Sequence, residues 1–491
     1  MTNAEAVPPD LEAGEQDPKR WLGLVVIATA QLMVVLDASI VNIALPSAQK
    51  ALDISNADRQ WVITAYTLAF GGLLLLGGRI ADYVGRKKMF IIGLLGFAAA
   101  SALGGIAQNG AMLFCSRALQ GAFGALLAPA ALALITVTFT ESKERARAFG
   151  VYGAIAGGGA ALGLVLGGVL TEYASWRWCL LVNVPIAIIA ALAAVPILRE
   201  SIAHGDRKYD VPGAVTVTLG LVAVVYGFTK AALNGWASTT TISWLVLGIA
   251  LLVAFVVIEA KTSHPLLPLR VVLDRNRGGS FLASFLIGVA LFGMFLFLTY
   301  YMQGTLGYSA LKCGFAFLPF SAGVILAAGT ASQLLPKLGP KPLMVTGLTL
   351  CTLGMAWLTT LQVDSSYVTH VLPSEILMSF GLGLTFVPLA STALIGVANH
   401  DAGVASAMVN TTQQVGGSLG TALLNTVAAS ATAAFITVNG VASTPQALVE
   451  GYTSAFTWGA VIMAVAVITT LLLIRAKDKD LAETLEVAPA L

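Results

Sequence analysis

Apolar residues run through this chain in long stretches that short polar segments interrupt. A helix of about 20 apolar residues spans the ~30 Å hydrocarbon core of a bilayer. That length predicts fourteen transmembrane helices near residues 21–45, 58–78, 89–108, 111–138, 148–171, 178–198, 211–231, 241–260, 278–302, 312–335, 341–361, 371–397, 403–434 and 452–474. No polar segment between them is long enough to form a soluble domain. We therefore expect an all-α membrane protein.

The positions of the basic residues orient the predicted helices, because Lys and Arg concentrate in cytoplasmic loops. With both termini in the cytoplasm, inner segments hold 21 of the 27 Lys and Arg residues and outer segments hold five. Arg117 alone falls inside a predicted span. This bias supports the even number of spans. It also predicts cytoplasmic tails at 1–20, which we expect to be disordered, and at 475–491.

Composition excludes several classes of protein. Hydrophobic residues make up 57% of the chain and charged residues 11%, whereas a soluble domain has about half and about a quarter. The sequence contains neither a Gly-x4-Gly-Lys-Ser/Thr loop for ATP nor a His-Glu-x-x-His metal motif. We therefore expect no enzyme, and no cofactor, metal, ATP or nucleic-acid partner. A transporter without an ATP site must draw its free energy from an ion gradient. Moving one charge across the membrane supplies ~2.3 kcal/mol per 100 mV of membrane potential.

One loop, GRIADYVGRKK after the second predicted span, recurs in decayed form as QLLPKLGPK after the tenth. Aligning Gly339 with Gly85 places Lys341 on Lys87. Six spans, two inserted spans and six more produce this offset, as in the parallel repeats of transporters. We therefore predict an N-terminal six-helix bundle at 21–198, two inserted transmembrane helices with linkers at 199–277, and a C-terminal six-helix bundle at 278–474.

Three segments together resemble one transporter family. The loop after the second span is similar to the signature loop of the major facilitator superfamily in its residues Gly78, Arg79, Asp82, Gly85, Arg86 and Lys87. LDASIVNIALP at 36–46 resembles the first-helix motif of that superfamily's fourteen-helix drug:proton antiporters (EmrB/QacA-type multidrug efflux transporters). RALQG at 117–121 resembles their arginine motif. The resemblance implies the major facilitator fold, in which two six-helix bundles rock about a central cavity.

Asp37 and Arg117 are the predicted residues of proton coupling. Asp37 lies well inside its span, where an ionised carboxylate costs about 2.5–3.5 kcal/mol on insertion scales. It binds either a proton or a cationic drug, or it is a structural carboxylate bonded to a neighbour such as Asn42. Arg117 keeps its charge, and in the family it tunes the protonation of a nearby acid. The alternative is that Arg117 anchors backbone carbonyls. Gln120 lies on the same helix face.

The resemblance implies that the loop at 78–88 is a gating latch. In such proteins the acid, here Asp82, pairs with helix ends and locks the inner face shut in the outward-open state. A purely topogenic role would explain Arg86, Lys87 and Lys88, but neither Asp82 nor the glycines.

A stripe of glycines in the predicted helix 148–171 consists of Gly159, Gly163, Gly167 and Gly168. Glycine at every fourth position forms a flat surface for close helix contact, and it predicts a packing hinge rather than a polar site. The family has proline after the second of these glycines, where this chain has Leu164. The bend that proline gives is in doubt, and so is any inference of antiport from this motif alone.

Aromatic and amide side chains are candidates for lining a substrate cavity. Phe285 and Phe292 fall on one face of the span 278–302, and an aromatic wall suits flat or cationic drugs. Packing within the bundle or against lipid is the alternative. The other candidates are Asn42, Tyr66, Gln120, Asn410, Gln413 and Gln414. Two acids near the outer face, Glu172 and Glu375, are expected to be exposed surface carboxylates, and the alternative is a place in a substrate vestibule.

Together with these features, the resemblance implies a proton-coupled secondary exporter (an antiporter) of amphipathic drugs or toxic small molecules, of the kind that confers antibiotic resistance, in the bacterial inner (plasma) membrane; export rather than import rests on the resemblance alone. Its expected partners are protons, a small amphipathic substrate and membrane lipids. Export of lipids or cell-envelope precursors is the alternative within the same class. The alternative from another class is a membrane sensor or scaffold that does not transport. The presence of Asp37, Arg117 and the complete loop argues against that last hypothesis.

Overall fold

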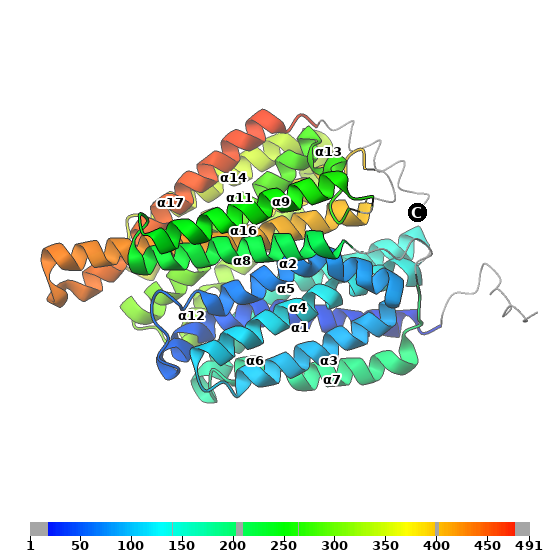
Figure 1. The fold of residues 1–491 in the computed structure, drawn as a ribbon, viewed down its shortest axis with the longest axis horizontal. Helices are drawn as coiled ribbons and strands as arrows, with labels where there is room; N and C mark the ends of the chain where they lie inside the picture. Colours follow the sequence, from blue (N-terminus) through cyan, green and yellow to red (C-terminus); the bar gives the residue numbers. More distant parts are fainter. Residues whose placement is uncertain (1–17, 140, 203–209, 264, 398–401, 477–491) are drawn as a thin grey trace, which may run out of the picture.

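The computed structural model describes residues 18–139, 141–202, 210–263, 265–397 and 402–476 (Figure 1). Long helices packed side by side make up these residues, and none of the described residues lies in a β-strand. Thirteen helical segments of the described chain are long and apolar enough to cross a membrane. The predicted all-α membrane fold is confirmed.

The blue to cyan helices of Figure 1 form the N-terminal half. They are α1 (Arg20–Ala51), α2 (Trp61–Val84), α3 (Arg86–Gly105), α4 (Gly110–Thr138), α5 (Ser142–Tyr173), α6 (Trp178–Leu181) and α7 (Asn183–Ile197). α6 and α7 together make one membrane-length segment. α4 packs between α2 and α3, while α1 packs against α5 and α7. An apolar core that includes Phe90 and Phe97 lies among these helices.

The two inserted helices are α8 (Val211–Asn234) and α9 (Thr239–Lys261), drawn in green. α8 lies against α2 of the N-terminal half and α16 (Ala402–Asn439) of the C-terminal half. Gln60 Nε2 donates to Thr229 Oγ1 at 2.9 Å, and Thr426 Oγ1 donates to Phe228 O at 2.8 Å. α9 packs on α8, and only 11% of its most apolar stretch is buried. The inserted pair therefore joins the two halves through α8, and α9 presents most of its surface outward.

The C-terminal half contains α10 (Leu269–Val272), α11 (Arg275–Tyr300), η1 (Tyr301–Thr305), α12 (Ala310–Ala316), α13 (Leu318–Leu338), α14 (Pro340–Leu358), η2 (Tyr367–Val371), α15 (Leu372–Thr392), α16, η4 (Val441–Ser443) and α17 (Thr444–Leu473). The segments η1 and η2 are π-helical turns. The span predicted at 312–335 is divided, because α12 ends and α13 begins with Pro319 in its first turn. Proline lacks an N–H and is well tolerated in the first turn of a helix.

The count of fourteen spans stays a prediction, because the fifth predicted span, at 148–171, is not among the thirteen membrane-length segments. α5 is 32 residues long, but its described apolar part, Gly159–Tyr173, is shorter than a membrane-crossing helix. α1 begins and α17 ends at the same end of the bundle, on the right in Figure 1. An even number of crossings would bring them there. We call this the terminal end and the opposite end the distal end.

The two halves are hydrogen bonded to each other at the distal end, through contacts that we call the distal seam. They join Gln303 Nε2 to Ile43 O (3.0 Å), Leu311 N to Glu172 Oε2 (3.0 Å), Arg59 Nε to Asn425 Oδ1 (3.2 Å) and Tyr300 Oη to Gln49 Oε1. The Arg59 guanidinium also lies 4.0 Å from the centre of the Tyr300 ring. The structure is therefore closed at its distal end.

Candidate functional site

Asp37 and Arg117 meet in the interior of the N-terminal half. Asp37 belongs to α1 and Arg117 to α4, and Arg117 Nη1 donates to Asp37 Oδ2 at 2.6 Å. The two side chains are 0% and 2% exposed. The sequence singled out each residue separately, and the fold brings them into contact across 80 positions of the chain.

Two amides complete the surroundings of the Asp37 carboxylate. Gln120 Nε2 donates to Asp37 Oδ1 at 3.0 Å, and Asn183 Nδ2 donates to the same oxygen at 2.8 Å. Gln120 Nε2 also donates to Ser101 Oγ at 2.6 Å. All of these side chains are buried. The Asp37 carboxylate therefore accepts charge-assisted hydrogen bonds from a guanidinium and further hydrogen bonds from two amide groups.

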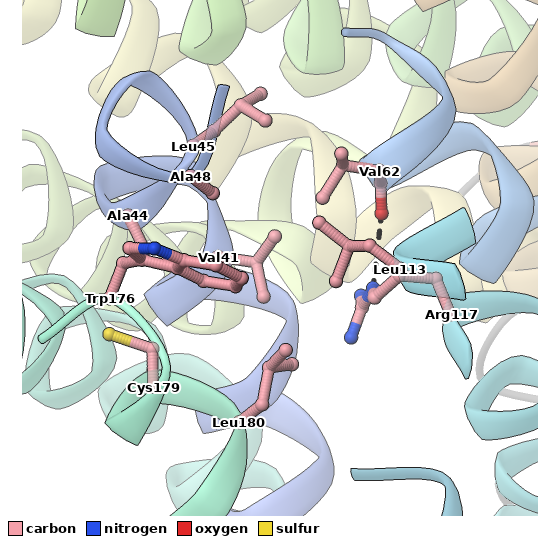
Figure 2. Close-up of a pocket in the computed structure, with 10 residues that line it drawn as sticks. All are labelled: Val41, Ala44, Leu45, Ala48, Val62, Leu113, Arg117, Trp176, Cys179 and Leu180. Carbon is pink, nitrogen blue, oxygen red and sulfur yellow. Dashed lines mark hydrogen bonds between the residues drawn. The ribbon is translucent and has the colours of Figure 1, made fainter. Parts of the chain in front are cut away.

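Arg117 is held from three further directions. Its Nε donates to Val62 O at 3.0 Å, the bond drawn in Figure 2, and its Nη1 donates to Gln120 Oε1 at 2.7 Å. The guanidinium carbon lies 4.4 Å from the centre of the Tyr66 ring. Arg117 thus pairs with an acid and also anchors a backbone carbonyl, so both sequence hypotheses about its contacts describe part of its geometry.

Asn183 and Ser101 were missed by the sequence analysis. Asn183 begins α7, within the short turn between α6 and α7, and Ser101 lies on α3. Neither residue lies in a motif that the sequence analysis assigned to a site. Asn42, which the sequence offered as a partner for Asp37, instead donates from Nδ2 to Ala38 O at 3.1 Å.

Removing one partner of this pair is expected to lower the stability of the fold by more than the intact pair contributes to it. A buried ion pair often contributes little net stability, because both charges lose water. Removing one partner leaves the other charge buried and unpaired, at a cost of about 3–5 kcal/mol.

A small cavity lies beside Arg117 on the distal side of the pair. Figure 2 shows its lining: Val41, Ala44, Leu45, Ala48, Val62, Leu113, Arg117, Trp176, Cys179 and Leu180. Its volume is ≈ 10 Å³, which is about the space of one water molecule. Asn183 Oδ1 is buried without a hydrogen-bond partner in the described structure. The interior near the pair therefore has room for a water and an unused acceptor.

A larger apolar groove of ≈ 390 Å³ lies between α1 and α5. Its lining consists of Trp21, Leu24, Val25, Ala28, Thr29, Leu32, Val151 and Ile155. Leu32 and Asp37 are five positions apart on α1, which is about 7.5 Å along the helix axis. The groove therefore runs from the terminal end to within a short distance of the ion pair.

The predicted latch loop folds around two carboxylates. Asp82 Oδ1 accepts from Arg86 Nη2 at 2.9 Å and from Arg86 Nε at 3.0 Å. Glu200, which follows α7, accepts the backbone N–H groups of Lys87 and Lys88 at 3.0 Å each. Carboxylates are favoured at a helix N-terminus, here that of α3, where N–H groups lack partners. Asp82 is thus paired inside its own loop, and Glu200 is a member that the sequence analysis missed.

Gly85 is required at the centre of this loop. Its φ is +125°, a value that other residues rarely adopt. A Cβ at this position would lie 2.8 Å from the Glu200 carboxyl group. The remaining loop glycine, Gly78, faces Pro129, with 3.4 Å between a would-be Cβ and Pro129 Cβ. Arg79 Nη1 donates to Tyr83 Oη at 3.4 Å.

The loop in the C-terminal half has the same backbone plan, which confirms the sequence alignment. Gly339 has φ +72° at the position of Gly85. Lys87 Nζ donates to Val195 O near the end of α7 at 2.6 Å, and Lys341 Nζ donates to Leu471 O near the end of α17 at 2.7 Å. Each lysine therefore ties its loop to the last long helix of its own half.

The glycine stripe of α5 packs against backbone and small side chains, as predicted. Gly159, Gly163 and Gly167 face α1, where a Cβ at Gly167 would lie 3.0 Å from Ile40 O. Gly168 instead faces α12, and a Cβ there would lie 2.6 Å from Leu311 Cα. Leu164 is 2% exposed and its carbonyl lies against Gly314 of α12. α5 therefore contacts its own half with one face and the C-terminal half with another.

The cavity candidates of the C-terminal half lie apart from the ion pair, whereas two of the N-terminal half lie beside it. Phe285 and Phe292 on α11 are partly buried against the glycines of α16, with 2.7 Å between a would-be Gly417 Cβ and the Phe292 ring. Asn410 is exposed, and Gln413 and Gln414 are partly buried. Tyr66 and Gln120 are buried around Arg117.

The expectation for one of the two outer acids is wrong. Glu375 is 1% exposed, because α15 carries it into the bundle, where it lies near Tyr367 of η2. Glu172 is exposed, as predicted. It also belongs to the distal seam.

Comparison with known proteins gives the family. The family model described as Major Facilitator Superfamily matches residues 27–421. The puromycin resistance protein pur8 of Streptomyces alboniger is 50% identical over 473 residues, which cover 95% of this chain and 94% of that protein. The cephamycin export protein CmcT of Amycolatopsis lactamdurans is 40% identical, covering 91% and 92%. This chain belongs to the major facilitator superfamily, and it is a multi-pass protein of the inner membrane.

Solved structures agree on the fold. A bacterial homologue of the human lysosomal transporter Spinster, in an inward-facing and unoccupied conformation, superposes with a TM-score of 0.66 at 14% identity. The match covers 96% of this chain and 99% of that one. At this identity the likeness supports the major facilitator fold and nothing about substrate.

Proposed function

We propose that this protein is a proton-coupled exporter of amphipathic drugs, not an enzyme. The observation that carries the proposal is the buried Asp37–Arg117 pair, where one protonatable group is held by three donors beside an apolar groove. The relatives named for puromycin resistance and cephamycin export support small-molecule export. The groove between α1 and α5 supports an apolar or amphipathic cargo, because pockets for such ligands are mostly apolar with few polar groups.

Protonation of Asp37 is the proposed coupling step. A proton on the carboxyl group removes the negative charge that faces Arg117, and the guanidinium keeps only neutral partners, Gln120, Val62 O and the Tyr66 ring. An uncompensated buried charge is unstable, so the bundle is driven toward an arrangement that hydrates it or pairs it again. In the proposed exchange, Asp37 takes up a proton from outside in the other state and gives it up toward the cytoplasm in the state described here, where the ionised carboxylate makes these contacts again.

We infer from the basic residues that the terminal end faces the cytoplasm. The state described by the structure, closed at the distal seam, is then the one that admits substrate from the cytoplasm. Rocking of the halves opens the seam and releases substrate outside, as in other transporters built from repeats. The loop around Asp82 and Arg86 is proposed to latch the terminal end in that second state.

The test uses purified protein in liposomes with an imposed pH gradient. Movement of an ethidium-type dye and lumenal pH are followed together for wild type, Asp37→Asn and Asp364→Asn. Asp364 is an exposed acid on a distal loop and serves as the matched control. We expect coupled dye and proton movement in wild type and Asp364→Asn, and neither in Asp37→Asn. Dye movement that ignores the gradient in wild type would contradict the proposal.

Lipid export is the second candidate function, and the apolar lining of the α1–α5 groove favours it. The same liposomes distinguish it when the dye is replaced by a fluorescent phospholipid and its transfer between leaflets is measured. Transfer that depends on the gradient and on Asp37, without dye transport, would replace the drug by a lipid as the substrate.

A further inference from the structure

Glu375 is a buried carboxyl group that the proposed coupling step does not use. It lies in the first turn of α15 and is 1% exposed. Its Oε1 is buried without a hydrogen-bond partner, and no ion pair to it is formed within the described residues. An ionised carboxylate in such a place needs donors or a cation, and here one hydroxyl group is its recorded polar neighbour.

The hydrogen bonds of Tyr367 indicate where a proton lies. Its hydroxyl oxygen is 2.6 Å from Ala316 O and 3.1 Å from Glu375 Oε2. A tyrosine hydroxyl carries one proton, and a backbone carbonyl has none to give. The short contact with Ala316 O therefore takes the hydroxyl proton. The contact with Glu375 is then satisfied when the carboxyl group carries its own proton and donates it to the Tyr367 oxygen.

Ala316 connects this pair to the distal seam. It is the last residue of α12, and α12 carries the C-terminal side of the contact with α5. On that helix Leu311 N–H donates to Glu172 Oε2, and Gly314 lies against the carbonyl of Leu164. The Tyr367–Ala316 hydrogen bond therefore fixes the end of the helix that closes the two halves. Two π-helical turns, η1 and η2, flank α12, and such turns are frequent at functional sites.

We propose that Glu375 is a second proton-binding site, and that its protonated form keeps the distal seam closed through Tyr367 and Ala316. Loss of the proton to water at the distal end leaves a carboxylate, which draws the Tyr367 hydroxyl away from Ala316 O. Tyr367 keeps its proton and changes only its acceptor. α12 then loses one tether and the seam weakens. The site acts on the distal seam and carries no proton across the membrane. This inference rests on the proposed function, in which the protein alternates between two states.

Other titratable groups around Glu375 have different partners. Lys312 Nζ lies 3.8 Å from the centre of the Tyr308 ring, and that ring lies 6.4 Å from the Tyr367 ring. Cys351 of α14 donates to Met378 O, and His370 of η2 pairs with Thr369. Cys313 of α12, Tyr301 of η1 and, across the seam, Glu172 of α5 are further titratable groups at the distal end. Lys337 of α13, Lys341 of α14, and Arg275 and Arg277 of α11 lie at the terminal ends of their helices, and Tyr300 of α11 donates to Gln49 Oε1.

The test measures the opening of the distal end against pH, without substrate. Spin labels are attached at Tyr173→Cys on α5 and Thr360→Cys after α14, both exposed positions. The exposed Cys115 is replaced by serine. An Asp37→Asn background removes the central proton site, so the remaining pH response belongs to other groups. We expect the labels to move apart as pH rises, and we expect Glu375→Gln to abolish this response with the labels close together.

Two further variants keep the test decisive. Tyr367→Phe retains the ring but removes the link, so we expect no pH response and a weakened seam at every pH. Glu172→Gln is the control acid on the seam, and we expect it to keep the pH response. An unchanged response in Glu375→Gln, or no response in the parent, would overturn the proposal. Liposome transport that does not depend on Asp37 would overturn the proposed function instead, and this measurement would still stand.

Discussion

The two copies of one loop differ in charge while sharing a backbone. In both, a glycine with positive φ begins a helix, and a lysine two residues later donates to a carbonyl of the last long helix of its half. In the N-terminal copy Asp82, Arg86 and Glu200 add an ion pair and a helix-terminal carboxylate. The C-terminal copy has Pro336 and Pro340 at the first two positions, and Ala476 five residues after the tied carbonyl, where Glu200 would correspond.

This difference separates what the fold needs from what switching needs. The shared glycine and lysine make the turn and hold it on the bundle, so either half requires them. The charges occur on one side only, and an exposed ion pair contributes at most about 1 kcal/mol to stability. Under the proposed latch, these charges serve an interaction made in the other state rather than the stability of this one.

The largest expected effect is on stability, in Gly85→Ala compared with Gly339→Ala. Both substitutions force alanine to a positive φ, at a cost of order 1–3 kcal/mol. At Gly85 the new Cβ also meets the Glu200 carboxyl group at 2.8 Å. We expect the lower apparent Tm in detergent for Gly85→Ala. Gly150→Ala on α5, where a Cβ has open space, is the control and should change little. Equal losses at the two loops would contradict the role of Glu200.

The second prediction concerns transport by Asp82→Asn compared with Pro336→Ala. Loss of the Asp82 charge should slow dye transport at least ~10-fold, which corresponds to about 1.4 kcal/mol in a barrier. Its apparent Tm should stay near wild type, because Asp82 is 37% exposed in its pair with Arg86. Pro336→Ala should transport like wild type. A Tm loss in Asp82→Asn that parallels its transport loss would make the ion pair structural.

The third prediction concerns Glu200→Gln. The amide oxygen still accepts from one of the two N–H groups, of Lys87 or Lys88, but the amide NH2 cannot accept from the other, and the side chain no longer offers a negative charge to the start of α3. We expect a loss of ~0.3–1 kcal/mol, the size of a charge effect at an exposed helix terminus. Thermal unfolding at low and high salt measures it, and the difference from wild type should shrink as salt is added. Glu450→Gln, at an exposed position, should show no such salt-dependent difference.

The smallest effect is expected for the two lysine ties, Lys87→Met and Lys341→Met. Each removes one hydrogen bond from a charged donor to a carbonyl at the surface, so each should cost less than about 1 kcal/mol. The losses should be equal within error, because the two bonds measure 2.6 and 2.7 Å in matching positions. A much larger loss at one lysine would show that the two loops are held differently.

The features that follow from local sequence were predictable. Apolar length predicted the positions of the spans, Gly339 and Lys341 predicted the second loop, and the spacing of the α5 glycines predicted a close helix contact, whose partner the structure identifies as α1. Asp37 and Arg117 stood out because charge inside a span is rare.

Features that depend on distant parts of the chain were not predictable in this way. Asn183, Ser101 and Glu200 reach their partners through the packing of separate helices, and no local pattern marks them. Glu375 was wrongly expected at the surface because a residue near a span end is exposed only if no neighbour covers it. Here η2 and α12 cover it.

The central claim is that the Asp37–Arg117 pair exchanges a proton when substrate binds. The most direct measurement adds a cationic dye to detergent-solubilised protein in weak buffer and follows pH with a soluble indicator. The account predicts that the dye releases protons from wild type and from Asp364→Asn, and releases none from Asp37→Asn although the dye still binds. Equal proton release from Asp37→Asn and wild type would contradict it.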